Sequence, residues 1–444
     1  MIIERNDYVA RLMAARLNGK IKVISGIHQS GKSFLLTNLY KGRLIEEGIP
    51  DDSFIEISLE RKADIKYRNP HKLYDYVIER TSDTERKFYV FIDGIELARK
   101  VKNGSGSISE DQVDEEYMDL MYTTVYDILN DLLDRPNLDI YITASNSRLI
   151  SENIAVNLSG GITEIKVMPL SFAEYLSTSP NDRKDALEEY IRYGGMPAAV
   201  LEPDEEKKRK YLQTLFDDVF LKDVTRRYNL KNNAILNPLL DTLASSVGSL
   251  TNPTKLAGRS GVLMEQAPSH STITRYLDYL EETFLFQGAR RWDIRGHQYF
   301  DSILKYYATD TGLNNARLQF SQEERAGLLE NVIYNELIRR GYSVDVGIVE
   351  LTRVVSGRRK QSQHEVNFVV NTGKTKLYIQ SALSVDTPQE KETVTFALKN
   401  TFDFFQRIVV LDGNDEPWYD DEGIMYIGII PFLLLPMADE ALKL

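Results

Sequence analysis

The chain has 444 residues, 42% of them hydrophobic and 27% charged, and a formal net charge of -12. This length predicts two to four domains with ample core, in a composition ordinary for a globular protein. The absence of cysteine excludes disulfides, thiolate metal sites and a cysteine nucleophile, and suits a reducing compartment. Because so acidic a chain repels phosphate overall, nucleic-acid binding would need a local basic patch.

The N-terminus lacks a basic-then-apolar signal pattern, and no run of about 18 apolar residues is present that could span a membrane. We therefore expect a cytoplasmic protein with no membrane partner. In chain order, residues 4–18 predict a helix, because their apolar positions recur every three or four residues. A short, apolar, β-branched segment at 21–25 predicts a buried strand.

The next eight residues match the full G-x-x-x-x-G-K-[ST] phosphate-binding loop, and helical spacing follows at 34–40. Gly26 and Gly31 let backbone N–H groups approach phosphate oxygens, and the new helix adds its positive end. Lys32 would reach the β- and γ-phosphates, and Ser33 would bind Mg²⁺. An ordinary glycine turn would leave both side chains without a role. The predicted nucleotide-binding residues are Gly26, Ile27, His28, Gln29, Ser30, Gly31, Lys32, Ser33 and Phe34.

A second strand is predicted at 54–59, a helix at 71–80, and a central strand of a parallel sheet at 87–93, where the run is continuously apolar. That run ends in Asp93, where phosphate-loop proteins place a second Mg²⁺-binding group. An acid at the end of a buried strand can also arise by coincidence. We favour the functional interpretation beside a complete phosphate loop, so Ser33 and Asp93 are the predicted metal ligands.

Residues 99–116 are polar and rich in glycine and serine, which predicts a surface loop, and a helix is predicted at 117–134. The strand at 138–143 ends in polar residues 144–147, at the sheet edge where a γ-phosphate or an attacking water would lie. Asn146 is therefore a predicted catalytic residue. A last short strand is expected at 165–167. Strands that alternate with helices predict a largely parallel sheet.

From residue 172 the pattern is helical, with helices predicted at 183–194, 203–229, 236–250, 254–258 and 271–284. Residues 284–286 and 289–292 predict a hairpin, and three helices with a hairpin make a winged helix-turn-helix. Its basic side chains are few for a DNA reader, so DNA binding and plain packing remain equal alternatives. These side chains are Arg275, Arg290, Arg291 and Arg295.

Residues 305–444 predict a further α/β unit, with helices at 328–337 and 389–405 and strands at 343–350, 364–370, 376–382 and 407–411. Asn367 and Gln380 stand where a restriction-type nuclease would carry an acid and a lysine. Amides cannot hold Mg²⁺ as carboxylates do. The unit is therefore expected to have a nuclease-like shape without nuclease activity.

The sequence resembles the prokaryotic AAA-family ATPases that carry a winged helix and a C-terminal domain of unknown function with a degenerate restriction-endonuclease-like core. The similarity runs nearly end to end, through residues 23–33, 91–96, 142–147, 168–172, 193–197, 305–313 and 330–331. It implies an α/β fold in which a parallel-sheet AAA domain of the P-loop type (1–175) binds ATP and Mg²⁺. A helical linker or lid (176–235), a winged helix (236–300) and an inactive nuclease-like α/β domain (301–444) would follow.

The chain departs from this family at charged positions. Gly94 follows Asp93 where the family has a glutamate that polarises the attacking water, so binding should survive while hydrolysis slows. Glu96, two residues on, is the predicted replacement and the second predicted catalytic residue. Gly161 stands where an arginine is usual, and Asn367 where the family has aspartate.

These features together predict a Mg-ATP-binding ATPase with weak hydrolysis, whose nucleotide binding is coupled to its C-terminal half. The alternatives are a nucleotide-sensing scaffold or regulator without turnover, and a DNA-binding protein that uses the winged helix. A protein partner is expected but cannot be named from the sequence. No arginine stands out as one that would complete a neighbouring subunit's site, so a monomer or dimer is expected.

Overall fold

The computed structural model describes residues 2–436 except 103–121, 148–156, 159, 231–233, 253–255, 257–267, 301–302, 322–323 and 356–357. It forms two compact units, Ile2–Val167 and Met168–Leu444. Most of the loop predicted at 99–116 and of the helix predicted at 254–258 lies outside the described residues. In the described part of the chain, no helix combines the length and apolar character that crossing a membrane requires.

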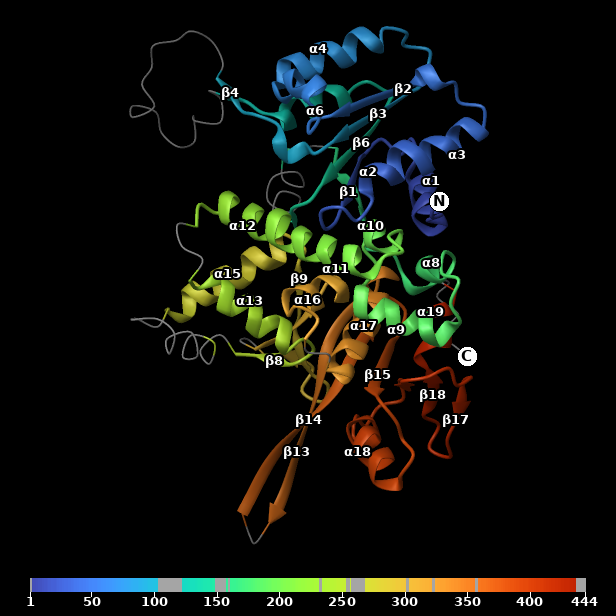
Figure 1. The fold of residues 1–444 in the computed structure, drawn as a ribbon, viewed down its shortest axis with the longest axis vertical. Helices are drawn as coiled ribbons and strands as arrows, with labels where there is room; N and C mark the ends of the chain where they lie inside the picture. Colours follow the sequence, from blue (N-terminus) through green and yellow to red (C-terminus); the bar gives the residue numbers. More distant parts are fainter. Residues whose placement is uncertain are drawn as a thin grey trace. The chain divides into compact units, whose positions relative to one another are not determined.

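The first unit is built on a five-stranded sheet in which every pairing is parallel, in the order β2-β3-β6-β1-β7 (Figure 1). The prediction of a largely parallel sheet is confirmed. The last strand starts three residues earlier than predicted, because polar residues interrupt its apolar pattern. The bounds are β1 (Ile21–Ser25), β2 (Phe54–Ser58), β3 (Phe88–Asp93), β6 (Leu138–Ala144) and β7 (Ile162–Lys166).

Helices cover both faces of this sheet. On one face lie α1 (Asn6–Ala15) and the continuous helix formed by α2 (Lys32–Phe34), the π-helical η1 (Leu35–Tyr40) and α3 (Lys41–Glu46); on the other lie α4 (Pro70–Arg80) and α6 (Val125–Leu133) (Figure 1). Residues 117–121 of the helix predicted at 117–134 lie outside the described residues. Helix α6 begins directly after Thr124, which caps it in a capping box. Shorter elements are η2 (Asp51–Ser53), η3 (Lys62–Arg68), η4 (Ile95–Leu97), β4 (Val101–Lys102) and β5 (Tyr122–Thr123).

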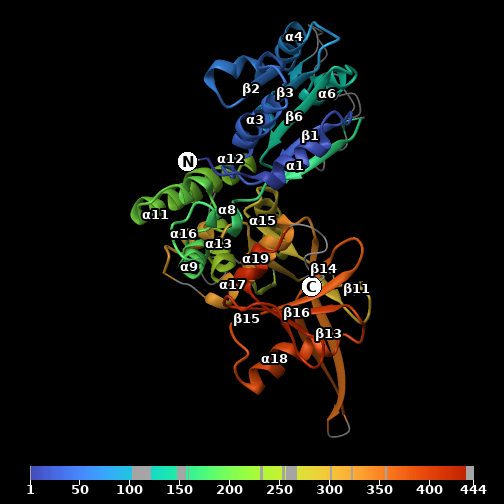
Figure 2. The ribbon, with the colours of Figure 1, turned by 90° about the vertical axis from the view of Figure 1, so that its right-hand side faces the viewer.

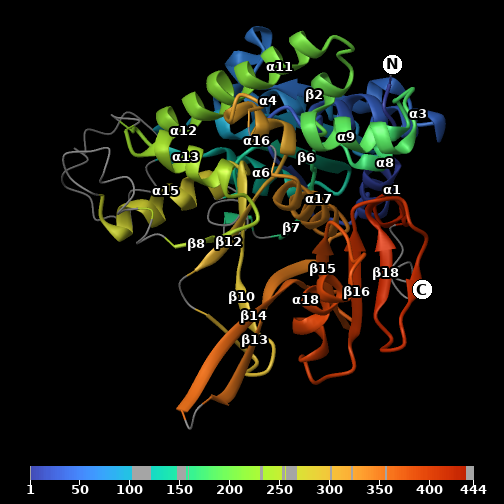
Figure 3. The same ribbon diagram turned by 60° about the horizontal axis from the view of Figure 1, so that its bottom comes forward.

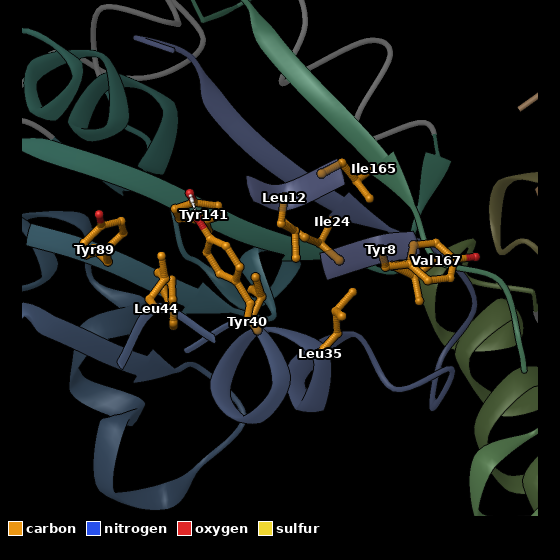
Figure 4. Packing of buried hydrophobic residues seen from close by; sticks show 12 residues of the cluster. Tyr8, Leu12, Ile24, Leu35, Tyr40, Leu44, Tyr89, Tyr141, Ile165 and Val167 are labelled. Atoms are coloured by element: carbon orange, nitrogen blue, oxygen red, sulfur yellow. Dashed lines mark hydrogen bonds between the residues drawn. The ribbon is translucent and has the colours of Figure 1, made fainter. Parts of the chain in front are cut away.

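The core between the sheet and the α1/η1 face contains a buried polar network. Lys22 on β1 and Asp139 on β6 form an ion pair in which both side chains are 1% exposed. The Tyr141 hydroxyl donates to Asp139 at 2.8 Å and lies 2.6 Å from the Tyr40 hydroxyl; both rings belong to a cluster of buried aliphatic and aromatic side chains (Figure 4). Because every charge in the network is paired, it fixes the register of β1 against β6.

The second unit begins with helices. The predicted helix at 203–229 is present as three consecutive segments, of which the middle one is π-helical. The bounds are α8 (Phe172–Leu176), α9 (Arg183–Tyr193), α10 (Pro197–Val200), α11 (Glu205–Thr214), η8 (Leu215–Leu221), α12 (Lys222–Arg227), α13 (Leu236–Ser245), α15 (His270–Glu282) and α16 (Thr311–Arg317).

A three-stranded antiparallel sheet in the order β8-β12-β9 follows these helices, and it corrects the predicted hairpin. Strand β9 (Phe286–Ala289) pairs with β12 (Leu304–Ala308), which also pairs with β8 (Leu250–Thr251). Strand β10 (Arg291–Asp293) instead joins a different sheet (Figure 3). Sequence patterns could not predict this pairing, because an apolar run indicates a strand but does not indicate which other strand it pairs with.

That larger sheet has eight strands in the order β11-β10-β13-β14-β15-β16-β18-β17. The long strands β13 (Ser343–Val355) and β14 (Arg358–Asn371) extend beyond their neighbours as a two-stranded ribbon, and α18 (Pro388–Lys399) packs beside β14, β15 and β16 (Figure 2). The remaining elements are β11 (Gln298–Tyr299), α17 (Arg325–Arg339), β15 (Lys376–Ala382), β16 (Gln406–Leu411), β17 (Trp418–Tyr419), β18 (Met425–Gly428) and α19 (Ile429–Leu434).

Candidate nucleotide-binding site

The predicted phosphate loop lies where β1 ends and α2 begins. Gly26 has φ +137°, and a Cβ there would lie 2.2 Å from the carbonyl oxygen of Val167. Gly31 has φ +91°, which places it in the left-handed region as the residue before α2. The two glycines are therefore required by the backbone, as the motif predicts.

The Lys32 side chain folds back across this loop. Its Nζ donates to the carbonyl oxygens of Gly26 at 2.9 Å and Ile27 at 2.8 Å, so one of the three ammonium N–H groups is left for an anion. Burial lowers the pKa of Lys32 to about 8, although Glu96, Asp93 and Glu60 raise it. The loop thus presents a cation, held in place by the backbone, at the start of a helix.

The two predicted metal ligands lie side by side. The Ser33 Oγ donates to Asp93 Oδ1 at 2.6 Å. Thr143 on β6 donates to the same carboxylate oxygen at 2.7 Å and accepts from the Gly94 N–H at 2.8 Å, which fixes the end of β3. A hydroxyl and a carboxylate oxygen are hard donors that suit Mg²⁺, which takes its other ligands from phosphates and water.

No group of three or more His, Asp or Glu residues that could hold a metal ion occurs in the part of the chain that the structure describes. A metal bound at Ser33 and Asp93 would therefore depend on ligands that a nucleotide brings. Such a metal would neutralise charge on the phosphates. The donor set fits this use.

The predicted catalytic residue Glu96 lies on η4 and contacts Ser145, which follows β6. The Ser145 hydroxyl donates to Glu96 Oε1, as does the Ser145 N–H at 3.3 Å, and the same hydroxyl lies 2.8 Å from His28 Nε2 in the phosphate loop. The other Glu96 oxygen, Oε2, is buried and has no hydrogen-bond partner. Glu96 is therefore joined to the loop through a serine that was not a predicted site residue.

The other predicted residues lie in or beside the loop. Asn146, the second residue after β6, is buried, and Phe34 at the start of the helix is 42% exposed. Ile27 and Ser30 are buried, while Gln29 adopts φ +60°. All of the predicted site residues in the first unit thus gather at the carboxyl end of its sheet.

Besides Ser145, Arg5 and Glu60 lie near the loop and were not predicted as site residues. Arg5, buried directly before α1, donates from Nη1 to the Ser30 carbonyl at 3.0 Å. Glu60 lies two residues beyond the end of β2, the strand that pairs with β3. Neither residue carries a local motif, and only the pairing of β2 with β3 brings Glu60 near the site.

The nuclease-like positions of the second unit form a closed network. Asn367 on β14 donates to Glu330 Oε2 at 2.8 Å, and its own N–H donates to Gln380 Oε1 at 3.2 Å. Lys305, 3% exposed on β12, forms 2.6 Å ion pairs with both Glu330 and Glu365. The carboxylates that could have bound a metal are therefore neutralised by a lysine from another strand.

Comparison with known families gives two matches along the chain. The AAA domain family matches residues 18–176, and a domain of unknown function matches residues 184–324. An uncharacterized protein of Haemophilus influenzae is 31% identical over 439 residues, which cover 98% of this chain and 99% of the relative. An uncharacterized protein of Methanocaldococcus jannaschii is 25% identical over 431 residues, covering 93% and 87%.

Among solved structures, the Aeropyrum pernix ORC1 protein in complex with DNA is 10% identical, with a TM-score of 0.29 over 71% of this chain and 92% of that one. Cdc6p from Pyrobaculum aerophilum is 9% identical, with a TM-score of 0.28 over 72% and 94%. These TM-scores are too low to bear on function. The sequence matches carry the assignment: the chain belongs to the family of the Haemophilus influenzae protein, and its phosphate loop lies in an AAA domain.

Proposed function

We propose that the chain binds Mg-ATP at the phosphate loop, hydrolyses it slowly, and uses binding to act on its C-terminal half. The observation that carries the proposal is the Lys32 ammonium, held by two loop carbonyls with one N–H to spare, beside the hydrogen-bonded pair of Ser33 and Asp93. Phosphate oxygens would satisfy the spare donor and complete the ligands of Mg²⁺.

The test is calorimetric titration of the full chain with ATP and Mg²⁺. Lys32→Ala should abolish binding, because it removes the charge that faces the phosphates. Lys72→Ala, an exposed lysine on α4, is the matched control and should bind as the wild type does. Unchanged ATP affinity in Lys32→Ala would refute the proposal.

The rate of hydrolysis separates the ATPase from the nucleotide-sensing scaffold. Gly94 leaves the end of β3 without the glutamate that the resemblance implies, which supports slow turnover. A phosphate-release rate of about 1 per second or faster, ordinary for phosphoryl-transfer enzymes, would count against slow turnover. A rate no higher than that of Lys32→Ala would favour the scaffold.

Nucleic-acid binding is the second candidate, but the predicted winged-helix arginines support it weakly. The Arg290 guanidinium lies over the ring of Tyr299 at 3.7 Å, and Arg291 is buried. Arg295 donates to the Glu350 carbonyl at 3.1 Å. Three of the four arginines are thus engaged within the chain.

The ribbon formed by β13 and β14 supports this candidate better. From residue 351 to 364 the chain has no acidic residue and four basic ones, in a protein of net charge -12. Two-stranded ribbons fit the major groove of a duplex, and basic residues bind its phosphates. The four residues are Arg353, Arg358, Arg359 and Lys360.

A fluorescent DNA duplex titrated with the full chain at several salt concentrations tests this candidate. The double variant Arg359→Ala/Lys360→Ala should weaken binding, and the salt slope should fall by about one for each phosphate that the variant no longer binds. Lys72→Ala is again the control. Absence of salt-dependent binding at low ionic strength would dismiss the candidate.

A further inference from the structure

The position of Gly94 is flanked by a carboxylate from the neighbouring strand. Strands β2 and β3 pair in parallel with Ser58 opposite Asp93, and the Leu59 N–H continues the ladder by donating to the Asp93 carbonyl at 2.9 Å. The next residue along the chain is Glu60. The pairing therefore brings Glu60 alongside Gly94.

The distance between the two positions is short. A Cβ built on Gly94 would lie 3.3 Å from Glu60 Cγ and 3.8 Å from Glu60 Oε1. The Glu60 side chain thus lies next to the space in which a side chain at residue 94 would begin. This is the position at which the resembling ATPases carry the glutamate that is absent here.

The backbone around Glu60 is held on both sides. The Arg61 N–H donates to the Ser58 carbonyl at 3.0 Å, which closes a turn, and Arg68 Nε donates to the Leu59 carbonyl at 2.7 Å. These hydrogen bonds hold the backbone of Glu60 in place beside Gly94, and positioning of this kind is what a catalytic group requires.

Glu60 and Glu96 differ in how their carboxylates are engaged. Glu96 accepts two hydrogen bonds from Ser145 at one oxygen, and its other oxygen is buried. Glu60 is exposed, and no described residue hydrogen-bonds to its carboxylate. A free, water-accessible carboxylate suits proton abstraction better than an engaged one.

We propose that Glu60 is the general base for ATP hydrolysis, supplied from the end of β2 in place of the missing residue after Asp93. A water oxygen attacks the γ-phosphorus, and the bond from that phosphorus to the bridging oxygen breaks, its electron pair leaving with ADP. The water's proton passes to the Glu60 carboxylate, which returns it to solvent. This inference rests on the proposed function.

The test measures binding and hydrolysis separately on the full chain. Glu60→Gln keeps the shape of the side chain and removes the base, so phosphate release should fall by about 100-fold or more while calorimetric ATP affinity is unchanged. Glu79→Gln, an exposed glutamate on α4, should keep the wild-type rate. Partial recovery of the rate lost in Glu60→Ala by adding Gly94→Glu would support the assignment, because it returns a carboxylate to the adjacent position.

A Glu60→Gln variant that hydrolyses ATP at the wild-type rate would overturn it, and loss of turnover in Glu96→Gln would then assign the base to Glu96 instead. Wild-type phosphate release no higher than that of Lys32→Ala would also overturn it, even with ATP bound. Failure of the proposed function itself has a different signature, since then Lys32→Ala and the wild type would bind ATP alike.

Discussion

The lowered pKa of Lys32 predicts that ATP affinity falls as pH rises from 7 to 9. With a pKa of about 8 in the free protein, the ammonium is about nine-tenths populated at pH 7 and about one-tenth at pH 9. Only the ammonium attracts phosphate, so ATP must bind the protonated fraction or bring a proton with it. The dissociation constant should therefore rise about tenfold across this range.

Isothermal titration at pH 7, 8 and 9 and constant ionic strength measures this change directly. Repeating the pH 9 titration in two buffers of different ionisation enthalpy should reveal the uptake of nearly one proton per ATP. Lys32→Arg is the matched control, because a guanidinium stays charged over the whole range and its residual affinity should not follow pH. Equal wild-type affinity at pH 7 and pH 9 would refute the reasoning.

Three further predictions concern stability. Gly26→Ala should lower the melting temperature more than Gly161→Ala, because both need a positive φ, costing about 1–3 kcal/mol, but only Gly26 also meets a carbonyl oxygen at 2.2 Å. Lys22→Met should cost about 3–5 kcal/mol in urea unfolding, since it leaves Asp139 buried and unpaired; a decrease below about 1 kcal/mol would contradict this. Burial raises the pKa of Asp310 to about 6, so its stabilisation is complete below about pH 4 and declines as pH rises through 6. The stability difference between wild type and Asp310→Asn should accordingly narrow from pH 4 to pH 7, and a constant difference would argue against it.

The sequence predicts the centre of the first unit well, because its strands are continuous apolar runs and its loop has a motif. β3 and β6 lie within a residue of their predicted bounds, and Ser33 at the start of α2 hydrogen-bonds to Asp93 at the end of β3. Strands at the sheet edges are harder: β7 has polar residues that break the apolar pattern, so its start was missed. The faces of a strand that are buried depend on the strands and helices beside it, so the pattern of apolar residues in an edge strand cannot be interpreted from the local sequence alone.

The missed site residues share a different cause. Ser145 becomes the link between Glu96 and His28 only because β6 lies between β1 and β3 in the sheet order. Glu60 lies beside Gly94 only through the β2–β3 register. Such relations arise from strand order, which single-sequence patterns do not encode. The same limit explains the wrong hairpin, since the true partner of β9 lies beyond β10 and β11.

The chain changes sheets at Arg290, the single residue between β9 and β10. A fragment cut after residue 300 would keep β10 without its neighbour β13 and β9 without β12, exposing two unpaired strand edges of the kind that aggregate. Lys305 connects the two sheets further, because its side chain extends from β12 and forms ion pairs with carboxylates on α17 and β14. We therefore expect that a cut at this point separates strands that need each other, and that the two sheets can be engineered only together.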